Sequence, residues 1–210
     1  MRMKLKHLLI FCVAVYFPNV VSIGAQNNHL VNSTADEDGK SWRTYGQTNV
    51  EEFMGNKVFV LRDKDNGQAS RFEQIINLRT TDIGKYALFI GRGSSERVNP
   101  DGAITGLPYL YGYMLRANSA SGFVVNEYLQ GQNMLAQPLR PEQWVTMWGI
   151  FKIPKETAAI QFILNQASRR GVPPNGSAAR FDDVGVYFFD NEQEALKFAK
   201  TYDKNFAKEQ

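Results

Sequence analysis

Three tyrosines alternate along one short stretch of the chain, from Tyr109 through Tyr111 to Tyr113, with Leu110 and Met114 at the positions out of phase with them. Successive side chains of a β-strand point to opposite faces of the sheet, so the three rings share one face and the aliphatic side chains share the other. A tyrosine ring offers a flat apolar surface with a hydroxyl group at its edge. The pattern predicts an exposed aromatic platform on which a ligand can stack. The alternative is that a loop covers the rings.

Other residues in predicted strands are candidates to bind a ligand beside this platform. Trp148 lies four residues after Trp144 and has the same strand parity, and it is the one of the two that we expect to reach a groove. Polar side chains could supply hydrogen bonds, and the candidates are Arg92, Glu127, Gln161 and Asn165. The alternative for each of these four is an ordinary solvated surface position.

The chain is poor in the residue patterns that catalytic sites use. Beyond residue 25 it has one histidine, His29, which disfavours a Ser-His-Asp triad and a multi-histidine metal site. A glycoside hydrolase needs two carboxylates across a cleft, and the acidic residues form no strand motif of that class. The sequence also lacks a P-loop and a dinucleotide-binding glycine motif. We therefore predict a protein that is not an enzyme, with a small lyase or hydrolase as the weaker alternative.

Residues 1–25 have the order of a secretory signal peptide. Arg2, Lys4 and Lys6 precede an apolar run, and small residues up to Ala25 follow it. The run has about ten residues, which is short for a bilayer span and disfavours the alternative of an uncleaved anchor. We predict cleavage near Ala25, export to the periplasm or the medium, and no stable membrane span.

Removal of this leader changes the charge balance. The full sequence has 24 basic and 21 acidic residues, and three of the basic ones lie in the leader, so 21 of each remain. The mature chain has no basic excess that would attract nucleic acid. The single cysteine, Cys12, is also in the leader, so the mature protein can form no disulfide and no thiolate metal site.

The residue pattern of the mature chain predicts a β-protein. Residues 26–40 are polar and predict a flexible lead-in. Runs rich in β-branched and aromatic residues then alternate with turn residues and predict eight strands, at residues 58–62, 72–78, 86–92, 109–117, 123–129, 144–153, 159–166 and 180–189. No helical pattern separates them, so residues 41–189 are expected to form an antiparallel jelly-roll β-sandwich.

One helix is predicted at the C-terminus, over residues 190–210. Ala195, Phe198, Ala199 and Tyr202 recur there at helical spacing. The simplest interpretation is a helix whose apolar side packs back on the sandwich. The alternative is a helix that docks a partner protein.

Segments of the second half follow a specific spacing: W-x4-G-x-F-x-I-P from Trp144 to Pro154, F-D-D-V from Phe181 to Val184, and G-K-Y upstream at Gly84. This succession resembles the carbohydrate-binding modules of the xylan- and glucan-binding type, which have a galactose-binding-like jelly-roll fold. The resemblance extends over roughly residues 32–189, with a looser opening that includes Trp42.

The resemblance implies an exported, non-catalytic module that binds an oligo- or polysaccharide through its aromatic face. Tyrosine rings would stack on the C–H faces of sugar rings, and the site residues would be Arg92, Tyr109, Tyr111, Tyr113, Glu127, Trp148 and Asn165. It also implies that Asp182 and Asp183 help to hold a structural calcium, an ion that prefers oxygen ligands. The alternative for the two aspartates is hydrogen bonding at a turn or strand end. The rival for the whole chain is a structural or protein-interaction jelly-roll module that binds no sugar.

Overall fold

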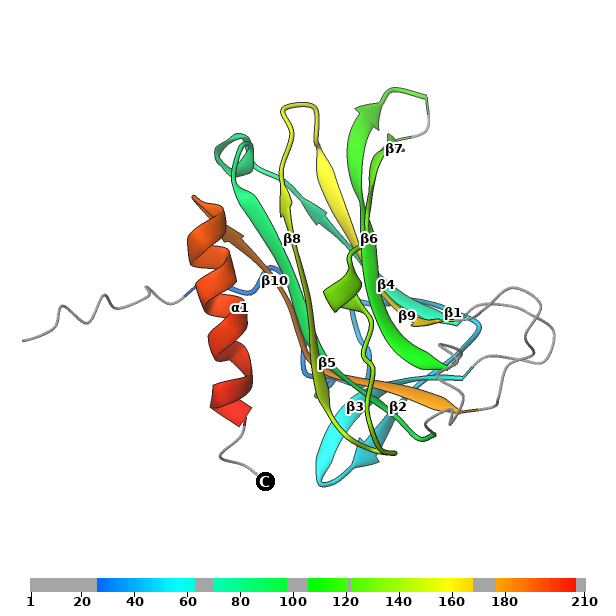
Figure 1. The fold of residues 1–210 in the computed structure, drawn as a ribbon. Helices are drawn as coiled ribbons and strands as arrows, with labels where there is room; N and C mark the ends of the chain where they lie inside the picture. The colour runs from blue at the N-terminus through cyan, green and yellow to red at the C-terminus, as the bar shows by residue number, and fades with distance from the viewer. Residues whose placement is uncertain (1–25, 63–69, 98–105, 121, 168–176, 207–210) are drawn as a thin grey trace, which may run out of the picture.

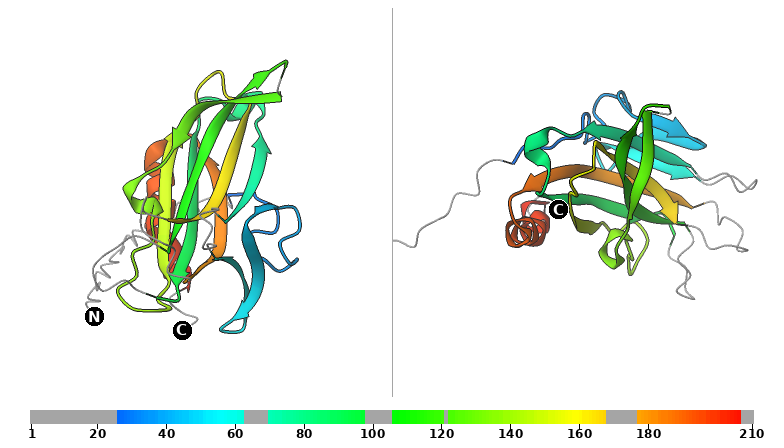
Figure 2. Two further views of the ribbon diagram at one scale, coloured as in Figure 1. Left: turned by 90° about the vertical axis from the view of Figure 1, so that its right-hand side faces the viewer. Right: turned by 90° about the horizontal axis from the view of Figure 1, so that it is seen from above.

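The computed structural model describes residues 26–62, 70–97, 106–120, 122–167 and 177–206, and the predicted signal peptide lies outside them. Two five-stranded antiparallel sheets stack face to face, and one helix lies on the outside of the second (Figures 1 and 2). The predicted antiparallel β-sandwich with a C-terminal helix is confirmed.

The first sheet carries the three alternating tyrosines on its central part. Its strand order is β1-β4-β9-β6-β7, with β1 (Arg43–Tyr45), β4 (Arg71–Asn77), β9 (Ala159–Ala167), β6 (Leu107–Asn118) and β7 (Gly122–Leu129). Two of its strand pairs join segments that are far apart along the chain, because β6 pairs with β9 and β9 pairs with β4. The sheet therefore brings together side chains from distant segments.

The second sheet has the order β2-β3-β10-β5-β8, with β2 (Gln47–Phe53), β3 (Asn56–Arg62), β10 (Ala178–Phe189), β5 (Tyr86–Ser95) and β8 (Val145–Lys152). All eight predicted strands are present, and β1 and β2 are additional. Two short 3-10 helices, η1 (Thr80–Asp82) and η2 (Gln132–Met134), lie in the connections.

The core between the sheets is built from the inward positions of both. Its fully buried aromatic residues are Phe59, Phe72, Phe89, Phe162 and Phe181. Trp42 closes one side of this cluster, with its ring centroid 5.0 Å from that of Phe59. Leu110 and Met114 fill the inward positions of β6, so Tyr111 and Tyr113 point away from this core. Tyr109 has the same parity, is half-buried and also contacts the core cluster.

The C-terminal helix α1 (Glu192–Phe206) packs on the outer face of the second sheet (Figure 1). Ala195, Ala199 and Tyr202 are buried there against Leu88 and Ile90 of β5. The helix thus buries its apolar side on its own sandwich, and docking of a partner protein by this helix stays a prediction. Among the helices in the described ranges, none has both the length and the apolar character needed to cross a bilayer.

The prediction that residues 26–40 are a flexible lead-in is wrong for the segment from Asn28 onward. The Asn28 amide donates to the Val184 carbonyl at 3.0 Å and its oxygen accepts from the Val186 amide at 3.1 Å. The Gln74 side chain likewise donates to the Val31 carbonyl at 2.6 Å, and Leu30 is buried. Polar composition misled the prediction, because these polar side chains pair with backbone groups instead of water.

Candidate functional site

Four tyrosine rings form one cluster on the outer face of the first sheet. The ring centroids of Tyr109 and Tyr111 are 5.6 Å apart and stacked, and Tyr111 meets Tyr113 edge to face at 5.8 Å. Tyr128 of β7 lies directly opposite Tyr113, at 5.3 Å, and also contacts Tyr111 at 5.6 Å. Tyr111 is 8% exposed and Tyr128 is 43% exposed, so the cluster has a buried base and an open edge.

Strand register places polar side chains of β4 and β9 on the same face as the rings. Residues directly opposite one another in neighbouring strands share a face. The three rows that cross the sheet are Tyr45–Arg71–Asn165–Tyr109, Arg43–Glu73–Ile163–Tyr111 and Ile75–Gln161–Tyr113–Tyr128. Neighbouring strands lie about 4.8 Å apart, so the face from β4 to β7 is about 14 Å wide.

Glu73 is the centre of the polar half of this face. Its side chain is buried, with the residue 3% exposed. It accepts hydrogen bonds from the Tyr45 hydroxyl at 3.2 Å, from Arg71 Nε at 3.2 Å and from Gln161 Nε2 at 2.9 Å. The Arg71 guanidinium also lies over the Tyr45 ring, 4.1 Å from its centroid. One carboxylate therefore holds three neighbouring side chains in fixed orientations beside the tyrosine cluster.

A depression of about 580 Å³ adjoins the Tyr109 end of the face. The segment after β7 forms one wall, because Leu135 pairs with Tyr109 in an isolated β-bridge and the Ala136 amide donates to the Pro108 carbonyl at 2.9 Å. Asn165 and Gln137 add polar groups to its lining. This segment flanks Tyr109 but leaves Tyr128 exposed, so the rings are only partly covered.

The hydroxyl groups of Tyr109 and Tyr111 stay protonated through the physiological range. Burial raises the pKa of Tyr111 to about 12. Burial, and then a hydrogen bond with Tyr128, raises the pKa of Tyr109. Neutral phenols can both donate and accept a hydrogen bond. Tyr109 and Tyr111 therefore contribute uncharged hydroxyl groups to the cluster.

This raised pKa predicts a loss of stability at high pH. The unfolded chain releases the Tyr111 proton near pH 10 and the folded chain near pH 12, so stability is full below pH 10 and declines as the pH rises through 12. We expect Tyr111 to contribute about 1–2 kcal/mol to this decline. This is less than the free energy that corresponds to the full pKa shift, because solvent screens part of the interaction. Urea unfolding at pH 8 and pH 11.5 measures it, and Tyr111→Phe should show the smaller decline. An equal decline in both proteins would contradict the assignment.

Three of the predicted site residues lie away from the tyrosines. Trp148 is on β8 of the second sheet, half-buried beneath α1, so the expectation that it lies on a strand beside the tyrosines is wrong. Arg92 is on β5 of the same sheet. Glu127 neighbours Tyr128 on β7 but points to the opposite face, because it pairs with the inward-facing Met114. Asn165 lies directly opposite Tyr109, and the further candidate Gln161 lies directly opposite Tyr113, so both join the tyrosines of β6.

Arg92 pairs instead with the two predicted calcium ligands. Its guanidinium is 3.2 Å from Asp182 Oδ2 and also forms an ion pair with Asp183. Asp183 has φ 48° and occupies the β-bulge of β10. Burial, and then the charge of Asp183, raises the pKa of Asp182 to about 6, against the opposing effect of Arg92. The bulge turns both carboxylates toward one cation, which is the arginine.

This arrangement does not fit a calcium ion. Calcium takes six to eight oxygen ligands, and here a guanidinium contacts both carboxylates. Within the described ranges, no group of three or more His, Cys, Asp or Glu residues is placed to hold a metal. A calcium at Asp182 and Asp183 stays a prediction that elemental analysis can test, and the ion would have to displace Arg92.

Several residues of the face were missed by sequence reasoning. Arg71 and Glu73 alternate with the buried Phe72, so the parity of β4 could have placed them on one outer face. The sequence around Tyr128 and Tyr45 does not show that they belong to this face, because their neighbours depend on which strands pair. Gln161 was a candidate for hydrogen bonding, and its partner Glu73 follows only from the register of β4 and β9.

Comparison with known proteins identifies the fold. No protein-family model matches the chain. No curated protein matches it either. Among solved structures, the chain is similar to a family 16 carbohydrate-binding module, with 16% identity, a TM-score of 0.50, and coverage of 76% of this chain and 99% of that one. It is also similar to the CBM22-1–CBM22-2 tandem domain of Xyn10C from Paenibacillus barcinonensis, with 12% identity, a TM-score of 0.50, and coverage of 80% and 47%.

A third similar structure is the enzymatically active domain of tailspike protein 4 from bacteriophage CBA120, with 14% identity and a TM-score of 0.51. The match covers 77% of this chain and 21% of the tailspike domain, so the chain spans about a fifth of that protein's length. At these identities the likeness concerns the fold, and function belongs to the site. The chain has the β-sandwich fold of carbohydrate-binding modules.

Proposed function

We propose that this chain is an exported, non-catalytic module that binds a glycan on the outer face of its first sheet. The observation that carries the proposal is the cluster of four tyrosine rings beside the side chains held by Glu73. Sugar rings have apolar C–H faces that stack on aromatic rings and hydroxyl groups that need hydrogen-bond partners. The tyrosine face offers both kinds of contact within one sheet. The β-sandwich likeness to a protein described as a carbohydrate-binding module supports the same function.

The composition of the face argues against hydrolysis. A glycosidase needs two carboxyl groups on either side of the scissile bond. Among the described strand residues that share the face of the tyrosines, Glu73 is the one carboxylate, and three side chains already donate to it. The active tailspike domain is about five times as long as the part matched here, so that likeness does not transfer an activity. Export is proposed from the leader alone.

The test is a glycan array followed by calorimetry with the best ligand. We expect Tyr113→Ala and Tyr128→Ala each to weaken binding by about 1–3 kcal/mol, which is roughly fivefold to 150-fold in Kd, because each removes a stacking surface. Tyr86→Ala is the matched control, since Tyr86 lies on β5 of the other sheet. Unchanged binding in both face variants, with normal melting, would place the ligand elsewhere. An array with no ligand would favour a structural or protein-interaction module.

A further inference from the structure

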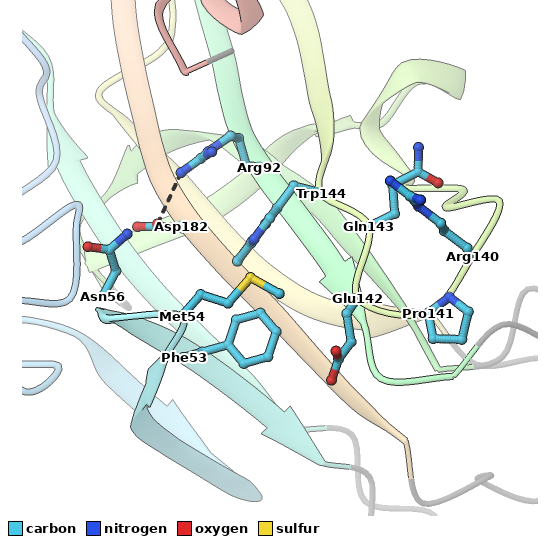
Figure 3. A pocket seen from close by; sticks show the side chains of 10 residues that line it. All are labelled: Phe53, Met54, Asn56, Arg92, Arg140, Pro141, Glu142, Gln143, Trp144 and Asp182. Atoms are coloured by element: carbon cyan, nitrogen blue, oxygen red, sulfur yellow. Dashed lines mark hydrogen bonds and ion pairs between the residues drawn. The ribbon is translucent and has the colours of Figure 1, made fainter. Parts of the chain in front are cut away.

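The second sheet also has an outer face, and α1 covers only part of it. The helix lies over Leu88, Ile90 and Trp148. The part beyond the helix holds a cavity of about 660 Å³, between the β2–β3 turn and the segment that leads into β8 (Figure 3). This volume lies within the usual range of small-molecule sites. The cavity is on the opposite sheet from the tyrosine face.

The floor of this cavity is the Arg92–Asp182 ion pair. The two residues are directly opposite each other in β5 and β10, and Figure 3 shows their side chains meeting at the back of the cavity. Asp182 is 5% exposed, so its carboxylate is part of a built floor and not of a mobile surface. Asp183 adds a second carboxylate to the same guanidinium. The floor therefore presents acceptor and donor atoms side by side, with one guanidinium between two carboxylates.

The walls of the cavity combine aromatic rings with polar side chains, among them Arg140 and Gln143. Trp144 lies with its ring 5.3 Å from the Arg92 guanidinium and meets Phe53 edge to face at 6.1 Å. Figure 3 shows Trp144 directed between Arg92 and the Phe53–Met54 turn. Asn56 and Glu142 add polar groups at the sides. Ring faces beside a hydrogen-bonding floor suit a ligand that is apolar on one side and hydroxylated on the other.

We infer that this cavity is a second binding site, which takes a single neutral pyranose unit or the end of a glycan chain. The lining carries both signs of charge, with Arg92 and Arg140 against Asp182 and Glu142, so a neutral ligand is favoured. Two adjacent hydroxyls of a sugar can donate to the Asp182 carboxylate and accept from the Arg92 guanidinium. Walls on both sides limit the length of the ligand, in contrast to the open tyrosine face. The chain would then hold two sugar sites on opposite sheets.

Nitrogen-15 NMR of the tryptophan indoles tests this site separately from the tyrosine face. The chain has three tryptophans, and the indole signals of the buried Trp42 and of Trp148 beneath α1 serve as internal controls. The probes are D-glucose, D-galactose, D-mannose and D-xylose, each added to about 50 mM, because single sugars bind weakly. We expect at least one of them to shift the Trp144 indole signal, identified with Trp144→Phe, and to leave the other two unchanged.

Two sets of variants decide the assignment. Asp182→Asn should weaken binding of the active sugar at least tenfold. Asn56→Ala, at the side of the cavity, should also weaken it, and this variant decides the assignment if the buried Asp182→Asn substitution prevents folding. The double variant Tyr113→Ala/Tyr128→Ala should keep the Trp144 shift, even if the tyrosine face binds nothing. No Trp144 shift with any of the four sugars would overturn the inference. So would a shift that is lost in the double tyrosine variant, or one that survives both cavity variants.

Discussion

Replacing Gly112 by alanine is expected to lower the free energy of unfolding by about 3 kcal/mol or more and to disrupt the tyrosine face. Gly112 sits between Tyr111 and Tyr113 and faces the core. A Cβ atom at this position would lie 2.2 Å from the Gln161 carbonyl oxygen and 2.7 Å from Phe89 Cε2. The carbonyl belongs to the paired strand β9, so relief of the clash requires β6 and β9 to separate. We therefore expect a loss of stability at the upper end of the range for overpacked cores.

Urea unfolding measures this loss, and Gly131→Ala is the control. Gly131 lies just after β7, and a Cβ there would have its nearest contact with the Met134 sulfur at 3.7 Å, which is an ordinary distance. We expect a change within about 0.5 kcal/mol for the control, as for other surface positions. A Gly112→Ala protein as stable as the parent would show that β6 and β9 are not paired in this register.

Replacing Glu73 by alanine is the second large effect. The carboxylate accepts from Tyr45, Arg71 and Gln161, and its removal leaves these donors without their shared acceptor. We expect a loss of about 2 kcal/mol in stability, because water can reach Arg71 and Tyr45 and replace part of the interaction. Glycan affinity should fall by more than tenfold, since the orientation of Gln161 beside Tyr113 is lost.

Calorimetry below the melting temperature separates these two consequences. Arg43→Ala is the matched control, because Arg43 is exposed and lies directly opposite Glu73 in β1. Glu73→Gln keeps the size of the side chain but removes its charge. We expect this variant to keep most of the parent's free energy of unfolding but to lose more of its glycan affinity. If Glu73→Ala bound the glycan as tightly as the parent, the polar half of the face would have no part in recognition.

Much of the sandwich could be predicted from local patterns. Seven of the eight predicted strands have inward positions filled largely by apolar residues, and period-two alternation indicates that burial. The exception is β7, which is exposed along most of its length. β1 and β2 were not predicted. β1 has three residues, all exposed, and β2 is exposed or half-buried throughout, so neither has a clear apolar face.

Only part of the site could be predicted. The sequence of one strand shows which of its side chains share a face, but it does not show which other strands pair with it. Parity within one strand placed Tyr109, Tyr111 and Tyr113 on one face. Whether another residue joins them depends on strand order, and β6 takes β9 as its neighbour while β8 goes to the second sheet. Trp148 was therefore assigned to the wrong surface, and Glu73 was not considered as part of it. A single sequence contains no local signal for such long-range pairing.

The central claim is that the tyrosine face binds the glycan, and its most direct test is nitrogen-15 NMR titration of the backbone with the best ligand from the array. We predict that the largest shift changes fall on residues 109–113, Gln161 and Tyr128, on neighbouring strands of the first sheet. Signals from the exposed side of α1, such as that of Lys197, should stay in place, because this side lies away from both proposed sites. Saturable shifts confined to the second sheet or to α1, with the tyrosine face unchanged, would contradict the account.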